Sequence, residues 1–238
     1  MKLQKLLFGS VIATLFAASA AFAVPITGTG TGSDGPVSAS ANLTFVDSTH
    51  LLLTLTNTLS ASLMNSAGQA LSDFEFNLSG GTITGIASSS GTLVNVNADK
   101  SVTNTTTPPT TTIPPGQWSL NTNVNVGGST FGFQLIALGN GQPDFMIVPD
   151  ADSFPNAHAA SLLGGQFNPW VRGTATFFLN GTGFSGDTTI TSSSFSFGTG
   201  PETFIPGVPG VPDSGATVAL LGLAMVGLAA FRAKFRKN

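Results

Sequence analysis

The chain has 238 residues, of which 8% are charged, and it contains no cysteine. This length suits one domain, or one domain with processed ends. The lack of cysteine excludes disulfides and thiolate metal sites, and eight lysines and arginines are too few for a basic nucleic-acid-binding surface. Six of these cations lie near the two ends, whereas all eleven acidic residues lie between Asp34 and Asp213, so the central part is strongly acidic.

The first 23 residues have the three parts of a secretory signal peptide. Lys2 and Lys5 form the positive start, an apolar run covers 6–18, and Ala21 and Ala23 occupy the small-x-small cleavage positions. We therefore predict export, with cleavage by signal peptidase after Ala23. An uncleaved anchor helix is the alternative, which the short apolar run disfavours.

The body, residues 24–197, alternates apolar and polar residues in many short runs separated by Gly, Asn and Ser. This period of two predicts antiparallel strands with one buried face. The number of runs predicts an all-β fold, a single antiparallel β-sandwich of jelly-roll-like form. Only 60–72 and 157–163 suggest short helices. The clearest alternating runs are 42–46, 51–58, 73–78, 120–126, 131–135, 175–179 and 195–197.

Two segments interrupt this pattern. Residues 101–117 are rich in Thr and Pro and have no apolar period, which predicts an exposed, extended loop that is dispensable for folding. Residues 198–212 are rich in Pro and Gly, which predicts a stalk between the body and the tail.

The C-terminal tail contains an uncharged apolar stretch at 215–231, followed by the basic end of the chain. A helix of this length would be roughly 25 Å long, at the short end for a membrane span. The basic end places the C-terminus in the cytoplasm by the positive-inside rule. The alternative is a buried helix of a globular core, which the basic end disfavours.

The tail resembles a known class of sorting signal. Val211, Pro212, Asp213, Ser214 and Gly215 precede the apolar stretch and the basic end, and this order resembles PEP-CTERM tails, most closely the VPDSG variant. The resemblance covers 211–238. It implies handling by an exosortase, a membrane-embedded, cysteine transpeptidase-like enzyme of outer-membrane bacteria that make exopolysaccharide. The five residues would be recognised by that enzyme, which would supply the catalysis.

The body is also weakly similar to ectodomains of other PEP-CTERM-type proteins. The similarity lies in the LTNT sequence at 55–58, the GTATF sequence at 173–177 and the FSFGT sequence at 195–199. Those ectodomains have no assigned activity, so the similarity implies no chemistry.

Several motifs that can indicate a binding or catalytic site are better explained here as ordinary structural features. Gly-x-Gly-x-x-Gly occurs at 30–35 and 181–186, but neither precedes a predicted helix that would hold a phosphate, so both are expected to be turn glycines. His50 and His158 are isolated, which argues against zinc, and we expect His50 in a turn. No Gly-x-Ser-x-Gly elbow is present.

The acidic residues offer two further possibilities. Asp144, Asp150 and Asp152 have the spacing of a fragment of a Ca²⁺ site, although no EF-hand glycine or closing glutamate is present, and a solvated acidic loop is the alternative. Asp73 and Glu75 alternate with phenylalanines and are expected on the solvent face. That position argues against a buried pair for glycoside hydrolysis.

Trp118 and Trp170 are candidates for stacking on sugar rings, and core packing is the alternative for both. Together, these features predict an exported, exosortase-processed protein of the cell surface or matrix, non-enzymatic and structural or adhesive in an exopolysaccharide layer. It would pass through an inner-membrane intermediate held by the C-terminal helix. The alternatives are a secreted carbohydrate-binding module and a secreted hydrolase. Apart from Ca²⁺, no cofactor is expected, and binding to acidic polysaccharide would go through Ca²⁺ on the three aspartates.

Overall fold

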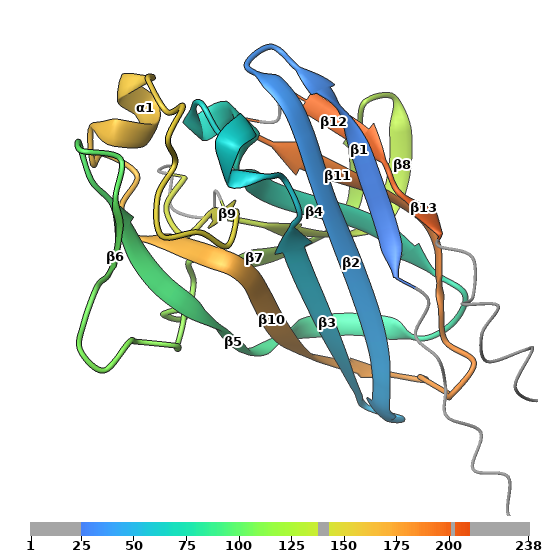
Figure 1. The fold of residues 1–238 in the computed structure, drawn as a ribbon. Coiled ribbons are helices and arrows are strands. Elements are labelled where there is room, and N and C mark those ends of the chain that lie inside the picture. Colours follow the sequence, from blue (N-terminus) through green and yellow to red (C-terminus); the bar gives the residue numbers. More distant parts are fainter. Residues whose placement is uncertain (1–24, 138–142, 201–202, 210–238) are drawn as a thin grey trace, which may run out of the picture.

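A computed structural model describes residues 25–137, 143–200 and 203–209, and these residues form mostly strands (Figure 1). Helical structure in these ranges is confined to α1 (Ala160–Leu163) and two 3-10 turns, Ala61–Leu63 and Ala67–Gln69. The strands are β1 (Ile26–Gly32), β2 (Gly35–Asp47), β3 (His50–Asn57), β4 (Leu71–Leu78), β5 (Thr82–Val96), β6 (Val102–Asn104), β7 (Ser119–Val126), β8 (Ser129–Ile136), β9 (Ile147–Val148), β10 (Trp170–Thr182), β11 (Ile190–Phe197), β12 (Thr203–Pro206) and β13 (Val208–Pro209).

The strands belong to one connected sheet. Its main order is β12-β11-β4-β9-β10-β3-β2-β1-β13, with β5 beside β10, β6 beside β5, β8 beside β4 and β7 beside β8. The all-β prediction is confirmed, but the sheet is mixed, because β9 runs parallel to β10. The expected antiparallel, jelly-roll-like sandwich therefore needs correction. Ile147 of β9 pairs with both Leu71 of β4 and Val171 of β10, which joins two sets of strands that a sandwich would keep apart.

The core follows the predicted alternation in most strands. Leu51, Leu53 and Leu55 of β3 are fully buried, and in the register of the sheet they lie opposite Leu179, Phe177 and Ala175 of β10. A second part of the core is aromatic: the ring centroid of Phe74 lies 5.2 Å from that of Phe76 and 4.9 Å from that of Phe195. Packed aromatic pairs of this kind add to the free energy of burial.

Strand β4 departs from the prediction. Its first six residues are all buried, so Asp73 and Glu75 lie in the interior and not on a solvent face. Strand β4 is central, between β11 and β8. Alternation shows which residues share a face of a strand, but it does not show whether the second face is covered.

Residues 203–209, predicted to be part of a stalk, belong to the sheet. β12 pairs with β11, and β13 pairs with β1, so this segment joins the two ends of the strand order. Gly28 makes the close approach possible, because a Cβ atom there would lie 2.6 Å from the ring of Phe195. Glycine in a strand interior often marks such close packing. Of the described residues of the predicted stalk, 203–206 and 208–209 are therefore strands of the sheet.

The Thr/Pro-rich tract 101–117 also contributes to the sheet. Most of its side chains are exposed, but Val102–Asn104 forms β6 on β5. The amide of Gly91 donates to the carbonyl of Thr111 at 2.8 Å, and Ile113 is only 2% exposed. The tract that was predicted to be an exposed loop therefore lies along β5, where backbone hydrogen bonds hold it.

Candidate functional site

The three aspartates of the predicted Ca²⁺ site are not brought together. Asp150 and Asp152 hold Arg172 instead, with Nε to Asp150 Oδ1 at 2.6 Å and Nη2 to Asp152 Oδ1 at 2.9 Å. The hydrogen bond that Arg172 donates to Asp150 raises the pKa of Arg172. Asp144 takes no part in this cluster, and no group of three or more metal-ligating side chains occurs within 25–137, 143–200 and 203–209. Two of the three carboxylates are therefore engaged in ion pairs with Arg172, which lies twenty or more residues further along the chain.

The two tryptophans are part of the core. Trp170 is fully buried, and its ring meets that of Phe167 edge-on at a centroid distance of 6.1 Å. Trp118 is 4% exposed, and its Nε1 donates to the carbonyl of Phe145 at 3.1 Å. Neither indole offers a free face to a sugar ring, so the core-packing alternative replaces the stacking prediction.

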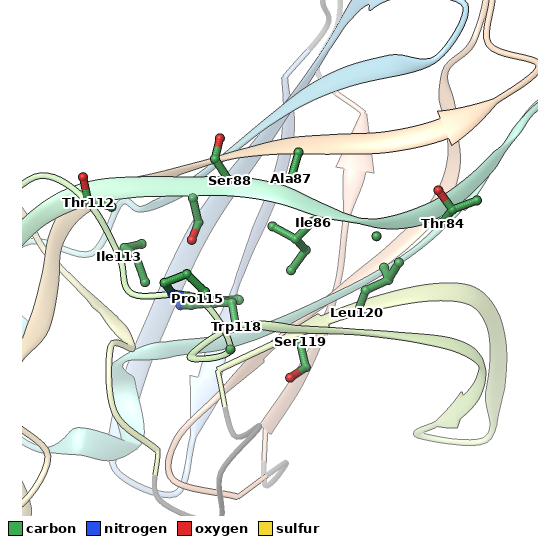
Figure 2. Close-up of a pocket in the computed structure, with 13 residues that line it drawn as sticks. Thr84, Ile86, Ala87, Ser88, Thr112, Ile113, Pro115, Trp118, Ser119 and Leu120 are labelled. Atoms are coloured by element: carbon green, nitrogen blue, oxygen red, sulfur yellow. The ribbon is translucent and has the colours of Figure 1, made fainter.

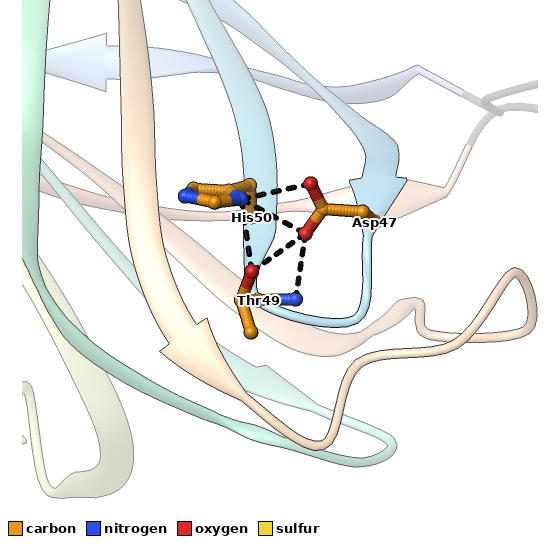
Figure 3. A network of polar contacts seen from close by, with 3 residues as sticks. All are labelled: Asp47, Thr49 and His50. Atoms are coloured by element: carbon orange, nitrogen blue, oxygen red, sulfur yellow. Dashed lines mark hydrogen bonds and ion pairs between the residues drawn. The ribbon is translucent and has the colours of Figure 1, made fainter.

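His50 is the first residue of β3 and follows the turn at 48–49 directly, so the prediction of a turn position is off by one residue (Figure 3). The Thr49 amide and hydroxyl both donate to Asp47 Oδ1 at 2.8 Å, and His50 Nδ1 lies 2.8 Å from the same oxygen. The backbone hydrogen bond from Thr49 is the main reason that the pKa of Asp47 falls to about 2. The imidazole also stacks on Phe178 at 4.9 Å. These contacts stabilise the turn.

Asp73 and Glu75 form an unexpected buried acidic pair on β4. Glu75 Oε1 accepts hydrogen bonds from Gln134 Nε2 and Ser196 Oγ, both at 3.1 Å, whereas neither carboxylate oxygen of Asp73 has a hydrogen-bond partner. Burial raises the pKa of Asp73 to about 8, and repulsion from Glu75 adds to the effect. Burial also raises the pKa of Glu75.

This pair does not have the arrangement of a glycosidase site. The two acids are both fully buried and lie two residues apart on one strand. Glycoside hydrolysis needs two carboxyl groups on opposite sides of an accessible sugar. Because burial raises both pKa values, the pair makes the stability of the fold depend on pH.

A groove of about 470 Å³ lies between β5 and residues 112–120 (Figure 2). This volume is within the range of small-ligand sites. Hydroxyl groups and apolar side chains share the lining, and none of the thirteen lining residues is charged. The hydroxyl-bearing residues are Thr84, Ser88, Ser89, Thr112 and Ser119, and the larger apolar ones are Ile86, Ile113, Pro115, Trp118 and Leu120.

No sequence motif indicated this groove. Its two walls are separated by more than twenty residues of chain, and they meet only because the 101–117 tract folds along β5. Trp118, which was predicted to stack on sugar rings, does line the groove. Its burial, however, leaves no ring face exposed for stacking.

A second groove, of about 510 Å³, lies beside Arg172 and is lined mainly by hydroxyl side chains, among them Ser90, Thr92, Thr111 and Thr174. Its only cation is already paired with Asp150 and Asp152. The groove therefore presents no free positive charge to a ligand.

The sorting motif at 211–215, the span at 215–231 and the cleavage residues Ala21 and Ala23 lie outside the described residues. Within the described part of the chain, no helix has the length and apolarity needed to cross a membrane. The described residues do show where both ends of the body lie. Ile26, at the start of β1, pairs with Pro209, at the end of β13.

Comparison with known proteins identifies the tail and nothing else. Residues 210–235 match the VPDSG-CTERM motif, so the suggested variant of the sorting tail is confirmed. This match implies export toward the cell surface. No curated protein and no solved structure matches the chain.

Proposed function

We propose that the protein is an exosortase-processed component of the cell surface or extracellular matrix, whose β body has a structural or adhesive role in a polysaccharide layer. The observation that supports this function is the VPDSG-CTERM motif at 210–235, which begins one residue after β13 ends. The signal peptide, the exosortase and the polysaccharide are part of the proposal.

The position of the ends supports processing of a folded body. Ile26 and Pro209 are paired on neighbouring antiparallel strands. Cleavage after Ala23 and within 211–215 would leave only a few residues beyond each strand. Five residues lie between Pro209 and Gly215, so the six steps from one to the other reach at most about 20 Å. Before the second cut, the body would therefore lie close to the membrane.

Intact-mass analysis of the native protein, in cells with and without the exosortase, tests the processing. We expect the mature species to lack both 1–23 and the basic C-terminal end, and to accumulate outside the inner membrane. Cells without the exosortase should keep the C-terminal end and hold the protein in the membrane fraction. Retention of 215–238 in cells with an active exosortase would contradict the proposal.

A secreted carbohydrate-binding module is the second candidate, because the uncharged groove beside β5 is a suitable place for a neutral ligand. A hydrolase has less support, since the paired acids that it would need are buried. We therefore propose a body without catalytic activity.

A further inference from the structure

We propose that the buried side chains of Asp73, Glu75, Gln134 and Ser196 form a binding site for one calcium ion inside the body. The site is distinct from the aspartates of 144–152, two of which are paired with an arginine. It lies within the folded sheet, so it requires neither the sorting tail nor its processing.

The register of the sheet brings the two carboxylates toward each other. Asp73 and Glu75 are two residues apart on β4, so both side chains leave the same face of the strand. Ser196 of β11 lies directly opposite Asp73, but its hydroxyl lies 3.1 Å from each carboxylate oxygen of Glu75. The Glu75 carboxylate therefore leans toward Asp73, which places both acids within reach of one ion.

The carboxylate of Asp73 is buried without a partner. The residue is fully buried, and neither of its oxygens takes part in a hydrogen bond. Of its neighbours in the strand register, Ile136 is apolar and the hydroxyl of Ser196 is directed to Glu75. A buried carboxylate is costly unless it is paired, hydrogen-bonded or bound to a metal. Both oxygens of Asp73 are therefore available as ligands.

No positively charged side chain of the described residues neutralises this pair. Lys100 donates to the carbonyl of Pro155 at 3.0 Å, and Arg172 is held by two aspartates. The ring nitrogens of His50 and His158 make their polar contacts within three residues of themselves. Two buried negative charges without a counter-charge favour either bound protons or a divalent cation.

The set of oxygen ligands suits calcium better than magnesium. The two carboxylates offer up to four oxygens, and the Ser196 hydroxyl and the Gln134 amide offer one each. Ca²⁺ accepts about six to eight such oxygens in flexible geometry, whereas Mg²⁺ requires a near-octahedral set and usually keeps several waters. Gln134 is only 6% exposed and Ser196 is fully buried. A site enclosed in this way favours the ion that loses its water more readily.

The amide of Gln134 can turn its oxygen toward the ion. Its Nε2 donates to Glu75 Oε1 at 3.1 Å, and its Oε1 accepts from Asn121 Nδ2 at 3.0 Å. A half-turn of the Gln134 amide exchanges its nitrogen and oxygen, and a half-turn of the Asn121 amide keeps the hydrogen bond between the two. Gln134 can therefore serve the protonated pair as a donor and the calcium-bound pair as a ligand.

Proton release distinguishes this site from any exposed carboxylates. Burial raises the pKa of Asp73 to about 8, so this group still holds a proton at pH 7. A metal ion must displace such a proton in order to bind, whereas acids with ordinary pKa values have none to release at this pH.

The test is titration of the full-length protein in detergent with calcium chloride, after metal has been removed with a chelator and the chelator by dialysis. Calorimetry at pH 7 in two buffers of different ionisation enthalpy measures the affinity and the number of protons released. We expect a Kd of about 0.1–1 mM, as for calcium sites of extracellular modules. We also expect release of about one proton for each ion bound.

Variants locate the site. Asp73→Asn and Glu75→Gln each remove one charge and keep the shape of the side chain, so calcium affinity should fall at least tenfold in both. Asp187→Asn removes an exposed carboxylate in a turn and is the matched control. Asp144→Asn checks the site expected from sequence. Both of these variants should stay within twofold of the wild-type affinity.

The melting temperature is a second measurement. In chelator, the wild-type protein should be less stable at pH 9 than at pH 5, and saturating calcium should reduce this difference because it neutralises the ionised pair. Asp73→Asn should lose most of the calcium effect. Circular dichroism of each variant checks the fold, and the proton release is measured on the wild-type protein, so it decides the matter even if a variant does not fold.

Three results would overturn the inference: no calcium binding, binding without proton release, or equal affinities in Asp73→Asn and in the two control variants. Tighter binding of magnesium than of calcium would do so as well. Calcium binding by a protein that keeps 215–238 in cells would contradict the processing alone, and correct processing of a protein that does not bind calcium would contradict this inference alone.

Discussion

At the scale of single residues, the buried carboxyl group of Asp73 is the least expected feature. Its pKa is raised to about 8 in the folded protein, against an ordinary value of 3.8. Between these values, the folded state keeps a proton that the unfolded state releases. Stability should therefore fall as the pH rises through this range. The raised pKa of Glu75 acts in the same direction.

The first prediction is that Asp73→Asn reduces this pH dependence. The wild-type protein should have a lower melting temperature at pH 9 than at pH 5, and the variant should lose much of that difference because its amide does not ionise. Asp47 and Asp99, whose pKa values are lowered, remain ionised throughout this range and do not contribute. Differential scanning calorimetry at both pH values is the measurement. The same loss of stability in wild type and variant would show that Asp73 does not titrate as expected.

The second prediction concerns the glycines at the closure of the sheet. A methyl group at Gly28 would overlap the ring of Phe195, and one at Gly207 would overlap the hydroxyl of Ser193. Gly28→Ala and Gly207→Ala should each lower the free energy of unfolding by about 1–3 kcal/mol, as overpacking does. Urea unfolding measures this change. Gly186→Ala, in open space, is the control, and it should change the stability little.

At the scale of elements, the Thr/Pro-rich tract 101–117 is part of the folded sheet, although its composition is typical of an exposed loop. It forms β6, its backbone hydrogen-bonds to β5, and it places Ile113 in the core. It also supplies part of one wall of the groove.

The third prediction is that replacing 101–117 by a short Gly/Ser turn destabilises the protein, contrary to the expectation from sequence. Loss of buried Val102 and Ile113 alone should cost about 3–6 kcal/mol, at about 1.5–3 kcal/mol for each side chain. Shortening only the exposed part at 106–109 is the control. It should cost little, since loop-closure entropy changes slowly with length. Equal, small losses for both deletions would show that the contacts to β5 do not stabilise the fold.

At the scale of the whole molecule, residues 203–209 bring the two ends of the body together. Ile26 pairs with Pro209, and Thr27 pairs with Val208. The sorting motif follows directly at residue 210. The last described residues before the sorting motif therefore lie beside β1 (Figure 1).

The fourth prediction is that Thr27→Cys with Val208→Cys forms a disulfide in the native protein. Residues directly opposite on antiparallel strands have Cα atoms about 4.5–5.5 Å apart, which suits a disulfide. The chain has no other cysteine to compete. A mass decrease of about 2 Da and a shift on a non-reducing gel would report the bond. Thr31→Cys with Val208→Cys is the control, because four residues along β1 separate the positions by about 13 Å. Equal cross-linking of both pairs would contradict the register.

The sequence predicted most strands for a physical reason that applies locally. A strand that buries one face must alternate, and the runs in β3, β7, β8, β10 and β11 do so. Composition was a poorer guide where polar or Pro-rich segments join the sheet through backbone groups, as in β6, β12 and β13. Hydrogen bonds between main-chain groups carry no side-chain signature, so these strands had none to detect.

By itself, the sequence determined the all-β class and the sorting tail, because strand alternation and the Val211–Gly215 motif are local patterns in the chain. Only the tertiary structure decided which charges meet, which faces are covered and where a groove forms. Arg172 forms ion pairs with two of the three aspartates of the predicted Ca²⁺ site. Asp73 and Glu75 are buried because both faces of β4 are covered. The groove arose where residues 112–120 came to lie along β5. Each of these outcomes depends on contacts between residues distant in the chain, which no local pattern records.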